Sequence, residues 1–372
     1  MDRRSNYSID SSALFFFNDS EGREMSDIGQ LRRDLAQPPH TGAPTAGRSS
    51  GRAFSARLQN FDGFCDLFGQ WIGEFRQLSR GPFQGEAQLV QGRDVGIFRA
   101  ETNQSLLTRG LDNSGFATFI PITRQNQASV WQGGRRLSAG QLIAKSPDIE
   151  YHNRTHRGDV IVGLFVPVQT LAAATRALTG ADSPGKSFTW AALRPDPRAL
   201  STFQQSLRRV LTAIQSDPTV FDSASGCVLE GECMRSLVDM LAGPATEKRT
   251  PRALRERQRL VKRAVDYIQE RLKEPLKPFS ALELCHELGV ADRTLRRVFK
   301  EAFGMGPVAY TRVMRMHSIR LALLEGRGHG LSVADVLGRW GVTRHGSFAA
   351  EYARHFGELP SRTLGVRVWS GE

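Results

Sequence analysis

The chain has 372 residues, of which 50 are Lys or Arg and 38 are Asp or Glu, so its formal net charge at pH 7 is +12. A chain of this length forms two or three domains, each able to bury its own core. Its longest apolar stretch, Val160–Val168, is far shorter than the roughly 20 residues of a membrane-spanning helix, which argues against a membrane protein. The cysteines form no Cys-x-x-Cys pair, which favours a reducing cytoplasm over a zinc site.

The positive charge is concentrated in the last third of the chain. Residues 251–372 hold 22 Lys and Arg against 13 Asp and Glu, whereas residues 1–250 hold 28 against 25. Such an excess favours binding to a polyanion, because neutralised phosphates release condensed counterions. The alternative is a solvated basic surface with no nucleic-acid partner.

The N-terminal half is predicted to be a tail followed by a small β domain. Residues 1–53 are rich in turn formers and poor in apolar anchors, so we expect a disordered extension. From residue 54 to about 166, short apolar runs such as Val95–Phe98 and Asp159–Val166 alternate with glycine turns, including a hairpin signal at Gly133-Gly134. This pattern indicates a small barrel or jelly roll, in a domain of residues 54–195.

Helices are predicted to follow. The first ends at Gly180, and the next begins with Asp196 as N-cap and Pro197 at the first helical position. Apolar residues then recur at spacings of three and four, which indicates either a dimerisation seam or a helix that faces a core. We assign residues 196–250 to a helical dimerisation and linker segment. The seam residues are Leu200, Phe203, Leu207, Val210 and Ile214.

An internal repeat occupies much of residues 251–372. The stretch Phe279–Val290 returns as Leu331–Val342 at an offset of 52 residues, and the match continues downstream at an offset of 53. Each copy is predicted as a short helix, a glycine-containing turn and a second helix, which is the helix-turn-helix pattern. Two such units in a basic segment predict DNA binding. The downstream pairs are Leu295 and Phe348, Phe299 and Tyr352, Phe303 and Phe356, Gly304 and Gly357, and Pro307 and Pro360.

The second helix of the first unit has an apolar face and an arginine-rich face. Leu295, Phe299 and Phe303 recur every four residues and are predicted to face the core. Arginines on the opposite face suit the major groove, where Arg binds guanine O6 and N7 bidentately. The residues of that opposite face are Arg293, Arg296, Arg297 and Lys300.

The second unit offers fewer residues that could read bases. Arg344, His345 and Ser347 lie near the start of its second helix, but Ala349 and Ala350 follow. Because small neutral side chains make no bidentate contacts, we expect the first unit to read bases and the second to position the duplex through phosphates. Residues 307–325 are predicted to form one joining helix of about 27 Å. That length would set the two recognition helices close to one DNA turn apart.

Two motifs in this region are typical of a known family. They are Val290-Ala-Asp-Arg-Thr-Leu-Arg-Arg-Val-Phe299 and Tyr352-Ala-Arg-His-Phe-Gly-Glu-Leu-Pro360. On these motifs, residues 255–366 resemble the DNA-binding domain of AraC/XylS-type bacterial transcription regulators. The resemblance implies base contacts by Arg293, Arg296, Arg297, His345 and Ser347. We expect phosphate contacts by Thr294, Lys300, Arg312, Arg344 and Arg362.

The chain departs from the family pattern at three positions. Ala291 replaces the usual serine cap, and Gly346 and Ala350 stand where polar residues are frequent. A narrower likeness, to the branch that contains the ethanolamine operon regulator, implies a cupin-like N-terminal domain that senses a small-molecule effector and helps dimerisation. It runs through Gln77–Gly85, Phe98–Gln104 and Gly346–Tyr352.

Two other functions remain open. A cupin-type metalloenzyme needs clustered His and Glu ligands, but His40, His152 and His156 are the only histidines before residue 250. On one strand, His152 and His156 would lie about 13 Å apart. The second alternative is a nonspecific architectural DNA-binding protein, which needs no sensor-sized domain. Candidates for a ligand pocket, or else for turn and core packing, are Asn103, Gln104, Trp131 and Tyr151.

The sequence therefore predicts an α+β, multidomain protein. A cupin-like β-barrel sensor domain is followed by helices and then by an all-α domain with two helix-turn-helix units joined by a long helix. We expect a sequence-specific transcription regulator, an activator, that responds to a small-molecule effector and recruits RNA polymerase to double-stranded promoter DNA. We expect a homodimer in the bacterial cytoplasm, associated with the nucleoid, with no cofactor, no metal, no catalytic residue and no membrane partner.

Overall fold

The structure is a computed structural model. It describes residues 52–72, 74–110, 115–124, 131–132, 135–145, 151–180, 191–217, 219–243, 252–273, 276 and 279–365. Residues 46–372 form one compact unit. The expected N-terminal extension, apart from its last two residues, lies outside the described residues, as do the Gly133-Gly134 turn and residues 244–250. No helix in the described part of the chain is long and apolar enough to cross a membrane.

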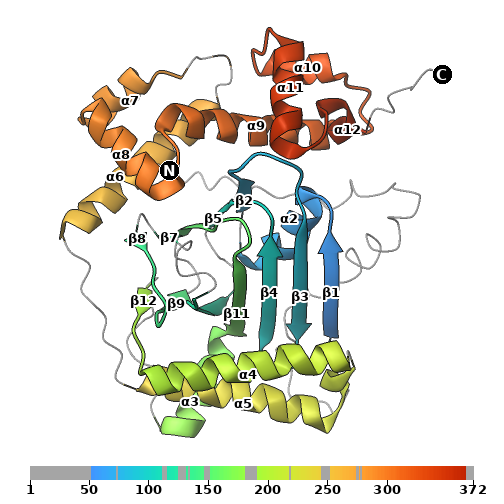
Figure 1. Cartoon of the computed structure of the whole chain (residues 1–372), viewed down its shortest axis with the longest axis vertical. Helices are drawn as coiled ribbons and strands as arrows, with labels where there is room; N and C mark the ends of the chain where they lie inside the picture. The colour runs from blue at the N-terminus through green and yellow to red at the C-terminus, as the bar shows by residue number, and fades with distance from the viewer. Residues whose placement is uncertain are drawn as a thin grey trace, which may run out of the picture. The chain divides into compact units, whose positions relative to one another are not determined.

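Antiparallel strands form the N-terminal part (Figure 1). They are β1 (Arg52–Leu58), β2 (Glu74–Gln77), β3 (Gly85–Gln91), β4 (Gly96–Thr102), β5 (Leu106–Gly110), β6 (Phe116–Pro121), β7 (Trp131–Gln132), β8 (Arg135–Arg136), β9 (Leu142–Lys145), β10 (Tyr151–Arg154), β11 (Val160–Pro167) and β12 (Ala191–Leu193). One sheet has the order β1-β3-β4-β11-β6-β9-β12 and the other the order β2-β5-β10-β7-β8. The closed cupin-like barrel that we expected is not found, because among the described strands the two edges of each sheet do not pair with each other. We refer to these two sheets and the helices packed on them as the two-sheet part.

Packing explains why two glycines stand inside the predicted strands. Gly163 of β11 lies opposite Phe98 of β4, and Phe165 of β11 lies opposite Gly96 of β4. A Cβ at Gly163 would come within 2.5 Å of the Phe98 ring, and one at Gly96 within 2.0 Å of the Phe165 ring. The two rings therefore occupy the space that a side chain on the facing strand would need, which explains why glycine stands in a strand interior.

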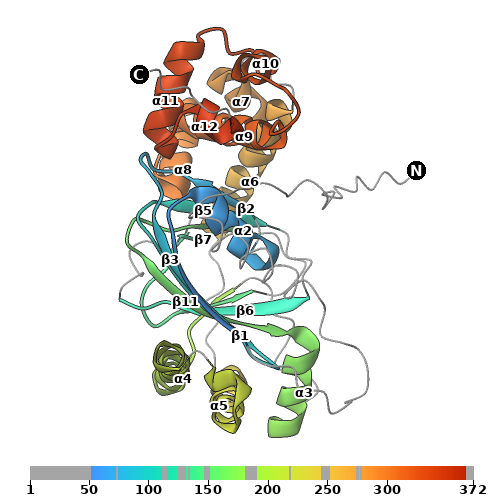
Figure 2. The same ribbon diagram turned by 90° about the vertical axis from the view of Figure 1, so that its right-hand side faces the viewer.

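Three helices cover the seven-stranded sheet (Figures 1 and 2): α3 (Val168–Thr179), α4 (Pro197–Ser216) and α5 (Ala224–Ala242). Asp196 caps α4 as predicted, since its carboxylate accepts from the backbone N–H groups of Arg198 and Ala199. The α4 and α5 helices pack on each other and share one core with the sheet. The expected seam residues Leu200, Phe203, Leu207, Val210 and Ile214 are all buried in that core.

The burial of the α4 seam corrects our interpretation of it as an exposed dimerisation surface. The apolar residues of α4 recur every three or four positions because they pack into the core of their own chain, as the alternative interpretation held. A dimer formed along α4 would have to use the outward face of the helix, which carries Arg208 and Arg209.

A helix was missed inside the segment predicted as strands. The α2 helix (Phe61–Ile72) packs against β2 and β5 of one sheet and β1 of the other (Figure 2). The ring of Phe68 lies 6.5 Å from that of Phe75 in the five-stranded sheet and 6.2 Å from that of Phe98 in the seven-stranded sheet. The space between the two sheets is therefore filled by aromatic side chains from α2.

The C-terminal part is all helical. Its helices are α6 (Arg252–Leu272), α7 (Ala281–Leu288), α8 (Asp292–Phe303), α9 (Pro307–Glu325), α10 (Val333–Arg339), α11 (His345–Phe356) and α12 (Pro360–Leu364). The joining helix α9 has the predicted bounds, with α6, α7 and α8 grouped at one end and α10, α11 and α12 at the other (Figure 1). All seven contribute side chains to one hydrophobic core, to which Leu78 and Leu107 of the two-sheet part also belong.

Candidate nucleic-acid interface

The repeat seen in the sequence is a repeat in the structure. The first helix of each unit, α7 or α10, begins after a serine, Ser280 or Ser332, whose hydroxyl accepts a backbone N–H three residues on. Gly289 and Gly341 follow these helices with φ angles of 65° and 62°. Glycine adopts this left-handed conformation without strain, so each turn can redirect the chain into the second helix.

The helix α8 presents a basic face to solvent. Leu295, Phe299 and Phe303 are buried, as predicted, and Arg293, Arg297 and Lys300 are exposed. These three cations form no ion pair with a carboxylate in the described part of the chain. Their charge is therefore available to an incoming anion. The N-cap Ala291 makes no side-chain hydrogen bond, which leaves the first N–H groups of α8 without a capping side chain.

Three of the other expected contact residues are already paired with carboxylates. On α8, Arg296 Nε donates to Asp292 Oδ2 at 2.6 Å. Arg312 of α9 donates to the Glu351 carboxylate of α11, and Arg362 Nε lies 3.8 Å from Glu358 Oε2. DNA phosphates would have to compete with these carboxylates, so these arginines offer less net attraction than Arg293, Arg297 and Lys300.

The helix α11 exposes smaller side chains. His345 and Ser347 are exposed near its start, and Arg344 is its N-cap residue. Thr294 of α8 is half-buried. Arg354 lies two turns after Ser347 on the same exposed face, which places a cation on α11 that our sequence analysis missed. Arg354 could have been found from the sequence, because a residue seven positions after Ser347 lies on the same face of a helix.

A hollow of about 600 Å³ lies between the two units. It is lined by apolar residues of α9, including Val308 and Val313, and by the charged side chains of both signs that follow: Arg80, Asp292, Arg296, Lys300, Arg312 and Glu351. Val308 is 57% exposed, although it is one of the apolar residues of the joining helix.

Arg320 of α9 is a buried arginine, since its side chain is only 5% exposed. Four hydrogen bonds and two ion pairs hold its guanidinium. Nε and Nη2 donate to the Asp62 carboxylate at 2.9 and 2.7 Å, and Nη2 also lies 2.7 Å from Glu358 Oε1. Nη1 donates to the Tyr352 hydroxyl at 3.0 Å and to Thr363 Oγ1 at 3.3 Å. Burial alone would lower the pKa of Arg320, but the hydrogen bonds and charge of Asp62 outweigh it and raise that pKa.

Two of the candidates for a ligand pocket, Asn103 and Gln104, instead form hydrogen bonds within a turn. Gln104 is buried, accepts from the Ser79 hydroxyl at 2.6 Å and donates to the Pro82 carbonyl at 2.8 Å. Asn103 accepts from the Gln84 N–H and also donates to the Pro82 carbonyl. Both residues therefore hold the 79–84 loop, as the alternative interpretation had it. The side chains of Trp131 and Tyr151 lie outside the described residues.

The histidines of the metalloenzyme alternative lie on and beside one strand. His152 is in β10, and His156 follows that strand and donates its backbone N–H to the Asp159 carboxylate at 2.8 Å. Over the described residues, no group of three or more His, Cys, Asp or Glu side chains could hold a metal ion. Among the described residues, the exposed cations of α8 and α11 are the side chains that match a predicted function.

Comparison with known proteins supports this location. A family model described as a helix-turn-helix domain matches residues 284–365. The chain is 31% identical over 105 residues to the probable thc operon regulatory protein of Rhodococcus erythropolis, covering 28% of this chain and 31% of that protein. It is 34% identical over 103 residues to the XylDLEGF operon transcriptional activator of Pseudomonas putida, covering 27% and 31%. The matches thus span about a third of these relatives.

Solved structures include a partial match. The chain is 16% identical to the AraC-like transcriptional activator CuxR, with 77% of this chain and 99% of that chain covered and a TM-score of 0.36, too low to establish a shared fold. The family model and the matches to operon regulators show a helix-turn-helix domain in the C-terminal segment, similar to segments of these regulators.

Proposed function

We propose that this protein is a transcription regulator that binds particular promoter sequences through α8 and α11. The observation that carries the proposal is the pair of equivalent helix-turn-helix units, whose first recognition helix exposes Arg293, Arg297 and Lys300 with no carboxylate partner among the residues that the structure describes. Arginine on such a helix reads guanine in the major groove, and lysine neutralises phosphate. His345 and Ser347 on α11 supply weaker contacts to a second major groove, and Arg344 contacts phosphate.

The regulation proposed is activation in response to a small-molecule effector. Two features support it: similarity to a relative named as a transcriptional activator, and a two-sheet part with its own core, larger than DNA binding requires. The effector would act on the two-sheet part of a homodimer, and the DNA-bound protein would contact RNA polymerase. The narrower likeness to the ethanolamine-regulator branch supports a small organic effector and does not specify which.

The experiment is retention of genomic fragments by the purified full chain at near-physiological salt, followed by sequencing. The proposal predicts enrichment of a few fragments, each with half-sites about 10 base pairs apart. Uniform retention that disappears as salt is added would show phosphate binding alone, and the architectural function would replace the proposal.

A further inference from the structure

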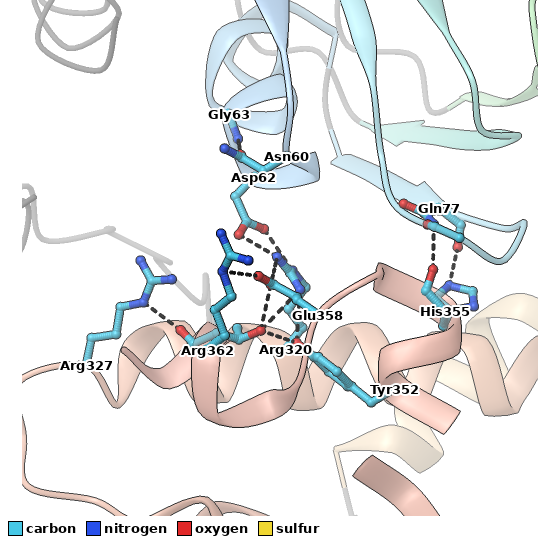
Figure 3. Close-up of polar contacts among 12 residues, drawn as sticks. Asn60, Asp62, Gly63, Gln77, Arg320, Arg327, Tyr352, His355, Glu358 and Arg362 are labelled. Carbon is cyan, nitrogen blue, oxygen red and sulfur yellow. Dashed lines mark hydrogen bonds and ion pairs between the residues drawn. The ribbon is translucent and has the colours of Figure 1, made fainter. Parts of the chain in front are cut away.

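The two-sheet part is joined to the second helix-turn-helix unit by buried polar contacts (Figure 3). Gln77 of β2 is fully buried, and its amide Nε2 donates to the backbone carbonyl of His355 at 2.7 Å. The backbone carbonyl of Gln77 lies 3.0 Å from Nε2 of both His355 and His317. Because a carbonyl only accepts, both imidazoles carry their proton on Nε2. The Gly81 N–H adds a bond of 3.1 Å to the His355 carbonyl.

A second contact comes from α2. Its Asp62 carboxylate takes two of the five donors of Arg320 in a bidentate pair, the strongest geometry for an arginine and a carboxylate (Figure 3). The remaining donors of Arg320 stay within the C-terminal part. If Asp62 moves away, two buried donors lose their acceptors, which strongly disfavours the separated arrangement. We call Asp62, Gln77, Arg320 and His355 the latch.

The helix that carries Asp62 also fills the interior of the two-sheet part. Phe64 and Phe68 of α2 lie 5.0 and 6.5 Å from the ring of Phe75, and Phe68 lies 6.2 Å from Phe98. A molecule that entered the space between the sheets would have to displace these rings. Because Asp62, Phe64 and Phe68 lie on one continuous helix of 12 residues, a displacement of the helix by its rings would also move Asp62.

We propose that α2 is a relay between the interior of the two-sheet part and the second helix-turn-helix unit. With the interior filled by Phe64 and Phe68, Asp62 holds Arg320 and the latch fixes the orientation of α11. A small apolar or aromatic ligand that takes the place of these rings withdraws Asp62 and releases that unit. The role of such a ligand as effector rests on the proposed function, but the contact between α2 and α9 does not.

Substitutions at two glycines allow an effect on the latch to be distinguished from an effect on the local turn. Gly357 and Gly365 end α11 and α12 with similar left-handed φ angles of 78° and 80°. A Cβ at Gly357 would come within 2.6 Å of the Cα of Pro82 in the two-sheet part, whereas the nearest atom to a Cβ at Gly365 is 3.9 Å away, on Arg327. Alanine therefore strains both turns equally but pushes against the two-sheet part only at Gly357.

The test is hydrogen exchange of the Gly81 amide in the full chain without DNA. Asp62→Asn and Gly357→Ala should each speed exchange at Gly81 at least tenfold. The matched controls should leave it unchanged. They are Glu86→Gln, which removes the same charge from an exposed ion pair with Arg57, and Gly365→Ala. Exchange at wild-type rates in both test variants would overturn the latch.

A different variant tests the role of α2 as a relay. Phe68→Ala leaves the four latch residues unchanged but should also speed exchange at Gly81. Phe221→Ala, which creates a cavity in the separate core under α4 and α5, should not. Equal effects of the two variants, or no effect of Phe68→Ala, would overturn the relay. Because this measurement uses no DNA, a failure here differs from a failure of the proposed function, which would appear as unspecific fragment retention.

Discussion

Phe299 and Tyr352 occupy equivalent positions of the two recognition helices and are both fully buried, but only Tyr352 carries a hydroxyl, which accepts from Arg320 Nη1 at 3.0 Å and lies 2.8 Å from Thr363 Oγ1. The duplicated core position therefore has an additional role in the second unit, where it supplies an acceptor to a buried cation. The two units share a framework and differ in how they connect to the rest of the chain.

Tyr352→Phe should lower the free energy of unfolding by about 1–2 kcal/mol, because it leaves a buried N–H of Arg320 without an acceptor. Urea denaturation, followed by a helical signal, measures the change. Tyr310→Phe is the control, because among the described residues its buried hydroxyl has no hydrogen-bond partner, and the variant should be no less stable than wild type by more than about 0.5 kcal/mol. Equal stability of wild type and Tyr352→Phe would show that the hydroxyl contributes nothing to Arg320.

Arg297→Ala should weaken binding to a specific site by about 1–3 kcal/mol and relax the preference at one base pair, because a bidentate contact to guanine is lost. Titration of the variant against a site series with each base pair changed measures both effects. Arg208→Ala removes an exposed arginine from α4 and should bind like wild type. Equal losses on specific and random DNA would assign Arg297 to phosphate instead.

Glu351→Gln should strengthen binding to any duplex, because it removes the carboxylate that pairs with Arg312 and frees that cation for a phosphate. The plot of log affinity against log salt should steepen by about 1 for the added phosphate contact. The double variant Glu351→Gln with Arg312→Ala should lose this gain. A gain that survives in the double variant would exclude Arg312 as its source.

Acid should open the latch. Burial lowers the pKa of His355 to about 4, with Arg80 and Arg320 adding to the shift, and burial lowers the pKa of His317, beside Arg76, Arg320 and His355. The docked arrangement thus holds both imidazoles neutral, whereas exposed imidazoles titrate near about 6.5. The contribution of His355 to docking is complete above about pH 6.5 and is lost as pH falls towards 4, at up to about tenfold in the docking equilibrium per pH unit.

Hydrogen exchange of the Gly81 amide at pH 7.5 and 5.5, corrected for the intrinsic rate, measures this loss of docking. His355→Gln should show a shallower dependence, since one titrating group is gone. Protection at Gly81 that is the same at both pH values in the wild-type protein would contradict the role of the two histidines.

The features that were predicted correctly depend on local sequence. The cap at Asp196, the glycine turns at Gly289 and Gly341 and the bounds of α9 depend on residues close in sequence, so the pattern alone located them. The repeat added a second, independent indication for the helix-turn-helix units. The base and phosphate contacts remain predictions, and most of those side chains are exposed.

Contacts between distant residues account for what was missed. Arg320 looks like a surface arginine until Asp62, 258 residues earlier, is brought beside it. The α2 helix was missed although Phe61, Phe64 and Phe68 recur at helical spacing, because the short strands predicted around it set the pattern of the whole segment. The spacing of the α4 residues is the same for a dimer seam and for an internal core, so only the tertiary packing distinguished them.

The most direct test of the account compares the affinity of the full chain for one enriched genomic fragment with its affinity for a scrambled fragment of equal length, over a series of salt concentrations. We predict that the enriched fragment binds at least about 1,000-fold more tightly near physiological salt, and that the advantage persists as both affinities fall. Equal affinities at every salt concentration would contradict sequence-specific binding by α8 and α11.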